Sequence, residues 1–238
     1  DGPHPRLEGT VHTAAAAIRG AGGQAVAVVG DVRSDDDIEH AVETAVADFG
    51  GIDIVINNAS AIDLSRSVAL EPSRYDLMQD INARGTFMLT RAAMPHLLLS
   101  EHRRVVSMSP PINLNPRWLG AHTGYTMAKY GMTLATLGIG AAFAEQGVVA
   151  STLWPRTTID TAAVRNVLGG EKLATLSRTP EIYADATYEV LTSWPASVAG
   201  RSLIVEDVLE AAGVSDFSKY AAVPGTPDFE LYPDIFLD

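Results

Sequence analysis

Two residues in a stretch of small side chains have the types and spacing needed to move a proton. Tyr125 and Lys129 are four positions apart in Tyr-Thr-Met-Ala-Lys, so on a helix they share one face. A free tyrosine has a pKa of about 10 and is a poor base at neutral pH, but a nearby ammonium lowers that pKa. Tyr125 is therefore a candidate proton donor and acceptor, although such a pair is also common on an exposed helix.

Other polar residues come directly after apolar runs. Asp31, the pair Asn57-Asn58, Ser109 and Trp154-Pro155 each follow one. In open parallel sheets, ligands bind beyond the carboxyl ends of the strands, which is where these residues are expected. Asp31 either caps the next turn or accepts a hydrogen bond from an adenine amine. Asn82 lies inside a helical run where asparagine is unfavourable; it keeps a kink, holds a water or is a surface residue.

The elements that would position these residues alternate along the chain. We predict strands over 24–30, 52–56, 104–108, 148–153 and 202–205, and helices over 9–21, 35–49, 72–99 with a bend near Gly85, 123–145, 160–168 and 180–193. Strands alternating with helices indicate βαβ units. The predicted fold class is α/β, a Rossmann-type doubly wound parallel sheet with helices on both faces.

Composition narrows the class of protein. A length of 238 residues suits one α/β domain or two small ones, and 47% hydrophobic residues can form a sizeable core. We predict one domain over 1–238, with 207–238 as a C-terminal tail that packs on it or on a partner subunit. The net charge of −12 argues against nucleic acid, and the lack of an 18-residue apolar run argues against membrane insertion. With no cysteine, thiolate metal sites and disulfides are excluded. We expect no metal and a cytoplasmic location.

Taken together and in this order, the motifs resemble the short-chain dehydrogenase/reductase family. The matching elements are Asp31-Val32, Asn57-Asn58-Ala59-Ser60, Asn82, a serine after a strand, Tyr125 with Lys129, and the turn that begins at Pro155. Longer stretches such as SPPINLNPRW and YTMAKYGM are similar to one subgroup of the family and its bacterial relatives. Ser60 and Arg156 stand where the family has glycine.

The resemblance implies an oxidoreductase that transfers a hydride between NADP or NAD, with NADP preferred, and a small apolar carbonyl or secondary alcohol. Tyr125 would be the acid/base, supported by Lys129, Ser109 at the carbonyl and Asn82 holding a water; Asn113 is the alternative carbonyl donor. The implied cofactor-binding residues are Asp31, Val32, Asn58, Ala59, Ser60, Tyr125, Lys129, Pro155 and Thr158. Trp118, Leu119 and Trp154 suggest an apolar guest.

One departure from the family pattern concerns the N-terminal part of the fold. The family opens with a strand, a glycine-rich phosphate turn, a helix and a second strand, whereas Gly22-Gly23 here end a helix instead of beginning one. The sequence is thus expected to lack the first two strands, roughly 40–50 residues, and residues 1–238 alone to bind NAD(P)H weakly.

Two other classes of protein compete with the dehydrogenase reading. One is a truncated, non-catalytic homologue that acts as a dimerising scaffold; the other is an extended-type epimerase or dehydratase. For the dehydrogenase we expect a homodimer or homotetramer. Its contacts would be made by the helices over 72–99 and 125–145, through exposed Ala128, Met132, Ala135, Gly138 and Ala142.

Overall fold

The computed structural model describes residues 9–238, and it places four parallel strands in one sheet. The first eight residues of the predicted domain over 1–238 lie outside the described residues. The strands are β1 (Ile54–Asn57), β2 (Arg104–Ser107), β3 (Val149–Trp154) and β4 (Arg201–Ile204), in the order β1-β2-β3-β4. Each strand pairs in parallel with the next, for example Val55 with Val105 and Val105 with Ala150. The predicted fold class is confirmed.

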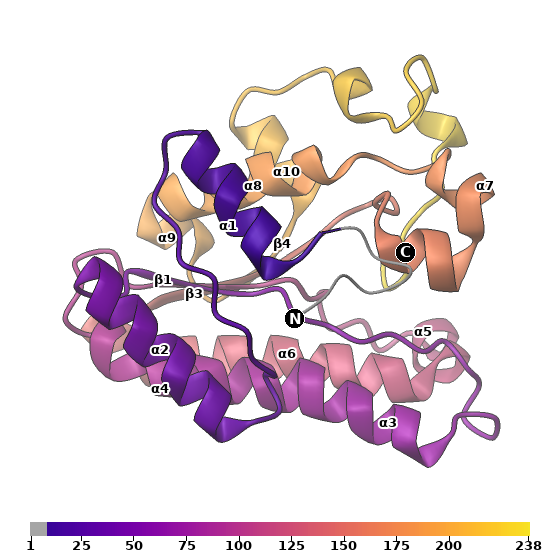
Figure 1. The fold of residues 1–238 in the computed structure, drawn as a ribbon. Coiled ribbons are helices and arrows are strands. Elements are labelled where there is room, and N and C mark those ends of the chain that lie inside the picture. The colour runs from indigo at the N-terminus through magenta and orange to yellow at the C-terminus, as the bar shows by residue number, and fades with distance from the viewer. Residues whose placement is uncertain (1–8) are drawn as a thin grey trace.

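Helices cover both faces of this sheet (Figure 1). One layer holds α2 (Asp35–Phe49), α3 (Pro72–Met78), the π-helix η1 (Gln79–Arg84), α4 (Gly85–Leu97), α5 (Pro116–Ala121) and α6 (Thr123–Ala142). The other holds α1 (Val11–Gly20), η3 (Val164–Leu168), α7 (Gly170–Ala174), α8 (Pro180–Thr192), α9 (Pro195–Val198) and α10 (Val205–Ala211). Short 3-10 turns lie at Ala144–Gln146, Ser218–Tyr220 and Asp228–Glu230.

The two central strands explain the two-sided core. Every residue of β2 and β3 is buried, because successive side chains point to opposite faces and both faces carry helices. Val105 packs toward α2, α4 and α6 with the cluster that contains Val55 and Leu97, whereas Val106 joins the cluster on the α8 and α10 side. The continuous apolar runs that predicted these strands arise from this burial.

The predicted strand over 24–30 is wrong. These residues belong to no strand, and their side chains are half-buried or exposed. A valine-rich run favours extended backbone, but a strand exists only in a ladder. In the described part of the chain, β1 pairs with β2 alone and no strand lies beside residues 24–30.

The C-terminal tail contains more structure than expected. The predicted tail over 207–238 begins inside α10, and its last residues return across the carboxyl end of the sheet. Tyr232 and Asp234 pair with the turn after β3: the N–H of Thr158 donates to the Tyr232 carbonyl at 3.0 Å, and the N–H of Asp234 donates to the Arg156 carbonyl at 2.8 Å. The tail therefore lies over the region where the candidate site is expected.

Candidate active site

Helix α6 brings the two central residues of the site together. Tyr125 and Lys129 lie one turn apart on α6, and both are 4% exposed. The π-helix η1 packs closely on α6 because Gly131 has no side chain: a Cβ there would lie 2.6 Å from the Ala83 Cβ. The bend expected near Gly85 is this π-helical turn, which ends one residue before it. Such turns often mark functional sites.

The charge state of this pair differs from the prediction. Burial lowers the pKa of Lys129 to about 7, and its Nζ donates to the Met108 carbonyl at 2.8 Å. Burial, and to a lesser degree the Asp234 carboxylate, raise the pKa of Tyr125. The expected lowering of the Tyr125 pKa by Lys129 is therefore not met in this conformation. The physical reason is that both side chains are cut off from water, which disfavours both charged forms.

Asn82 fastens the loop after β1. Its side chain is fully buried in η1; Oδ1 accepts from the Ala61 N–H at 2.7 Å, and Nδ2 donates to the Ala61 carbonyl at 3.0 Å. This two-point contact fixes the chain directly after Ser60. Asn58, Ala59 and Ser60 remain exposed at the carboxyl end of β1, so their backbone is open to a ligand.

The structure does not bring Ser109 to Tyr125. The Ser109 hydroxyl is fully buried and accepts from the Thr133 hydroxyl at 2.9 Å, two helical turns beyond Tyr125 on α6. Asn113 is nearer to the tyrosine's surroundings, since its Nδ2 donates to the Phe236 carbonyl at 3.0 Å and Phe236 stacks on Tyr125. Asn113 thus contacts a residue that touches Tyr125, whereas the Ser109 hydroxyl contacts Thr133.

The residues of the predicted adenine end lie apart from this buried pair. Asp31 forms a half-exposed ion pair with Arg33, which donates from Nε at 2.9 Å and holds the pKa of Asp31 below its usual value. Val32 packs against Gly85, where an added Cβ would lie 3.0 Å from the valine. Asp31 is thus accessible, but an adenine amine would have to share its carboxylate with Arg33.

The turn after β3 is in place but covered by the tail. Pro155 and Thr158, which the family resemblance assigns to the cofactor, are buried, and the Thr158 N–H donates to the Tyr232 carbonyl. The Thr158 hydroxyl lies 2.7 Å from that of Ser177. The backbone N–H and the side-chain hydroxyl of Thr158 are therefore both hydrogen-bonded within the chain.

Sequence reasoning missed an aromatic box around Phe236. Phe236 is 1% exposed, and its ring centroid lies 5.3 to 6.3 Å from the rings of Trp118, Tyr125, Tyr130 and Trp154. Trp118 and Trp154 were expected to line an apolar substrate pocket. In the structure, the Phe236 side chain fills the space between them. The proline and aromatic residues of the tail over 207–238 were the available signal, and they indicated a segment that packs on the domain or on a partner subunit.

The residues present fit a nicotinamide dinucleotide at one end of the site. The backbone after β1 and the Asp31 side chain are accessible at the adenine end. At the other end, Lys129 Nζ lies 5.3 Å from the centroid of the Trp154 ring, directly before the turn that contains Thr158, and Tyr125, Lys129 and Thr158 are all buried. Over residues 9–238, no three His, Asp or Glu side chains are grouped so that they could hold a metal ion.

Comparison with known proteins defines the class. Residues 5–171 match the short chain dehydrogenase family, so the chain belongs to that family and has its oxidoreductase fold. Among relatives, the chain is 46% identical over 236 residues to hydroxysteroid dehydrogenase-like protein 2 of Danio rerio, covering 99% of this chain and 55% of the relative. The expected subgroup is thereby confirmed. The chain spans about half the length of this curated relative.

Two solved structures are also similar. A putative dehydrogenase from Xanthomonas campestris is 47% identical with a TM-score of 0.94, and the match covers 100% of this chain and 86% of that one. A short chain dehydrogenase from Mycobacterium thermoresistibile is 48% identical with a TM-score of 0.91, covering 100% and 83%. In the part of the chain that the structure describes, no helix has the length and apolarity needed to cross a bilayer.

Proposed function

We propose that the protein transfers a hydride between NADP or NAD and a small apolar carbonyl compound or secondary alcohol. The observation that carries this proposal is the pairing of Tyr125 and Lys129 on α6 with Lys129 Nζ 5.3 Å from the ring of Trp154, the last residue of β3, directly before the Pro155–Thr158 turn. When bound, the dinucleotide supplies the hydride. Tyr125 exchanges a proton with the substrate oxygen at its hydroxyl.

The remaining residues bind and orient. Lys129 holds the nicotinamide ribose, and its ammonium, once formed, favours the ionised form of Tyr125. Asp31 and Val32 contact the adenine, and the backbone of Asn58, Ala59 and Ser60 with the Pro155–Thr158 turn completes the cofactor contacts. Asn82 fixes the loop after β1, which supports its assignment to the site. For the substrate carbonyl, Asn113 replaces Ser109 as the preferred donor, because the Ser109 hydroxyl is fully buried beside Thr133, whereas the Asn113 amide donates to the tail residues Phe236 and Asp238.

The test is a dinucleotide-linked assay of the full-length protein with a panel of apolar ketones and alcohols. We expect consumption of NADPH or NADH, followed by absorbance, that depends on the ketone. A protein that binds dinucleotide and oligomerises but turns over none of the panel would instead favour the non-catalytic scaffold.

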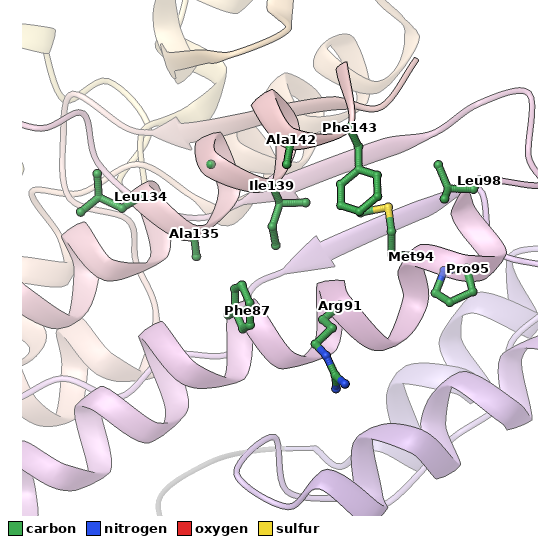
Figure 2. Close-up of a pocket in the computed structure, with 11 residues that line it drawn as sticks. Phe87, Arg91, Met94, Pro95, Leu98, Leu134, Ala135, Ile139, Ala142 and Phe143 are labelled. Carbon is green, nitrogen blue, oxygen red and sulfur yellow. The ribbon is translucent and has the colours of Figure 1, made fainter. Parts of the chain in front are cut away.

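The proposed homo-oligomer would use a groove between α4 and α6. It has a volume of about 650 Å³ and is lined almost entirely by apolar residues: Phe87, Arg91, Met94, Pro95, Leu98, Leu134, Ala135, Gly138, Ile139, Ala142 and Phe143 (Figure 2). Ala135, Gly138 and Ala142 line it as expected. Ala128 and Met132 are fully buried, so their predicted place on the exposed face was wrong. An apolar face of this kind is typical of obligate interfaces.

A charge in the groove should dissociate the oligomer. Leu134 is 64% exposed in the groove, so we expect Leu134→Arg to convert a dimer or tetramer to monomer, as measured by light scattering at micromolar concentration. Leu99→Arg is the matched control, because Leu99 is 84% exposed but does not line the groove. A wild-type protein that is monomeric at this concentration would refute the proposed assembly.

A further inference from the structure

The segment Pro233–Asp238 occupies the space that the proposed reaction needs. A substrate oxygen must come within about 3 Å of the Tyr125 hydroxyl to exchange a proton with it. Tyr125 is only 4% exposed, and the Phe236 ring stacks on it with centroids 6.1 Å apart. A substrate therefore cannot approach Tyr125 through the aromatic box while Phe236 fills it.

The tail also blocks the proposed nicotinamide contacts. Directly before the segment, the Tyr232 carbonyl accepts from the Thr158 N–H, and within the segment the Ile235 carbonyl accepts from the Trp154 indole N–H at 3.0 Å. At its far end, Asp238 accepts from Trp118 Nε1 and Asn113 Nδ2, both at 3.0 Å. The segment is thus held at both ends by side chains and backbone of the site.

Two features indicate that this arrangement is reversible. Phe236 has φ of 77°, the one positive φ at a residue other than glycine among residues 9–238, and such backbone is strained. At the end of the segment, the exposed Asp238 accepts from the half-exposed Asn113 and from Trp118 Nε1. Water can replace the bonds of this exposed carboxylate when the segment leaves, so that its release costs mainly the aromatic contacts, the packing of Ile235 and Leu237, and the Trp154–Ile235 bond.

We propose that Pro233–Asp238 is a displaceable gate, with Phe236 standing in the place of the apolar part of the substrate. The inference rests on the proposed function for what replaces the gate. The closed gate excludes substrate from Tyr125, and it holds the adjoining Tyr232 carbonyl on the Thr158 N–H, which excludes nicotinamide from Thr158. Opening exposes Tyr125, Lys129 and the aromatic box together, so the fraction of open molecules scales the apparent affinity for both ligands.

A reversible lock tests the gate. Thr157 and Pro233 are antiparallel bridge partners, and hydrogen bonds on both sides make them a non-hydrogen-bonded pair, whose Cα atoms are about 4.5 Å apart. That distance suits a disulfide, and the 238 residues contain no native cysteine.

In the full-length protein carrying Thr157→Cys and Pro233→Cys, we expect oxidation to weaken NADPH binding and to lower kcat/KM, each about tenfold or more, and reduction to restore both. Equal values in the two forms would overturn the gate.

A second pair of variants tests whether the Phe236 side chain blocks the substrate site. Phe236→Ala should lower the KM for an apolar ketone about tenfold, whereas Phe229→Ala, at a position 86% exposed on the same tail, should leave it unchanged. A raised KM in Phe236→Ala would overturn the proposal, because Phe236 would then be a wall that binds substrate.

A third readout separates the gate from the proposed function. Trp194 is 78% exposed, and Trp194→Phe leaves Trp118 and Trp154, the two tryptophans of the box, as the only ones in the chain. In this background, acrylamide should quench the reduced form of the double-cysteine protein more than the oxidised form. Equal quenching overturns the gate. More quenching in the reduced form without turnover of any ketone would support the gate while the proposed function fails.

Discussion

Replacing Tyr125 with phenylalanine should lower turnover by roughly 10²- to 10⁴-fold, the usual contribution of a positioned acid/base. The change removes only the hydroxyl. The ring that stacks on Phe236 and packs near Met78 and Trp118 is kept, so the melting temperature should change little. Initial rates in the dinucleotide-linked assay, together with a thermal melt, measure both effects.

The control is the same substitution at a tyrosine outside the site. Tyr220 is 2% exposed and donates its hydroxyl to Asp185 at 2.6 Å. Tyr220→Phe should cost stability, about 1 kcal/mol for one hydrogen bond, and leave turnover unchanged. Turnover by Tyr125→Phe within about tenfold of wild type would contradict the acid/base role.

Removing Arg178 should destabilise the fold by about 3–5 kcal/mol, the usual cost of breaking a buried ion pair. Arg178 is 3% exposed; its guanidinium lies 3.8 Å from Glu206 and donates to the Phe217 carbonyl at 2.9 Å. Arg178→Met would leave Glu206, 4% exposed, as a buried carboxylate without its cation. At about 2–4 °C per kcal/mol, the melting temperature should fall by roughly 6–20 °C.

The pH dependence and a double variant check this cause. Burial raises the pKa of Glu206 above its usual value, so the folded variant takes up a proton more readily than the unfolded chain. The deficit of Arg178→Met should therefore shrink as pH falls and grow as pH rises through that raised pKa. Adding Glu206→Gln should recover part of the loss at neutral pH. A deficit that does not change with pH would point to lost packing instead.

Local patterns predicted most of the fold. Ser34 and Gly50 bound α2 as expected, with Ser34 accepting from the Asp37 N–H and Gly50 in the left-handed region. These signals lie within a few residues of the helix end, so a sequence shows them directly. The strand expected over 24–30 failed because a ladder depends on a neighbour far away in the sequence, and propensity does not say whether that neighbour is present.

The site residues likewise divide into those that local spacing predicted and those that depend on contacts far away in the sequence. Tyr125 and Lys129 could be paired from their spacing alone, since both lie on one helix. Ser109 was placed by its position after a strand, but its rotamer depends on Thr133 across the core. Asp234 and Phe236 lie more than 100 positions from Tyr125 along the chain, and no local pattern indicates that a tail fills an aromatic box formed by α5, α6 and β3.

Closing the tail over Tyr125 also changes the number of protons that the protein binds. In the closed state burial lowers the pKa of Lys129 to about 7 and raises that of Asp234 to about 7. Lys129 lowers the pKa of Asp234 and Glu206 raises it further, whereas Tyr125 and Tyr183, whose own pKa values Asp234 helps to raise, stay neutral.

The two shifts oppose each other in their effect on opening. At pH below about 7, opening releases a proton from Asp234, so acid holds the tail closed. At higher pH, opening takes up a proton on Lys129, so alkali holds it closed as well. The tail is therefore released most easily near neutrality. A bell-shaped pH profile in this protein would then report the population of an open conformation, even if the chemical step itself had no pH dependence.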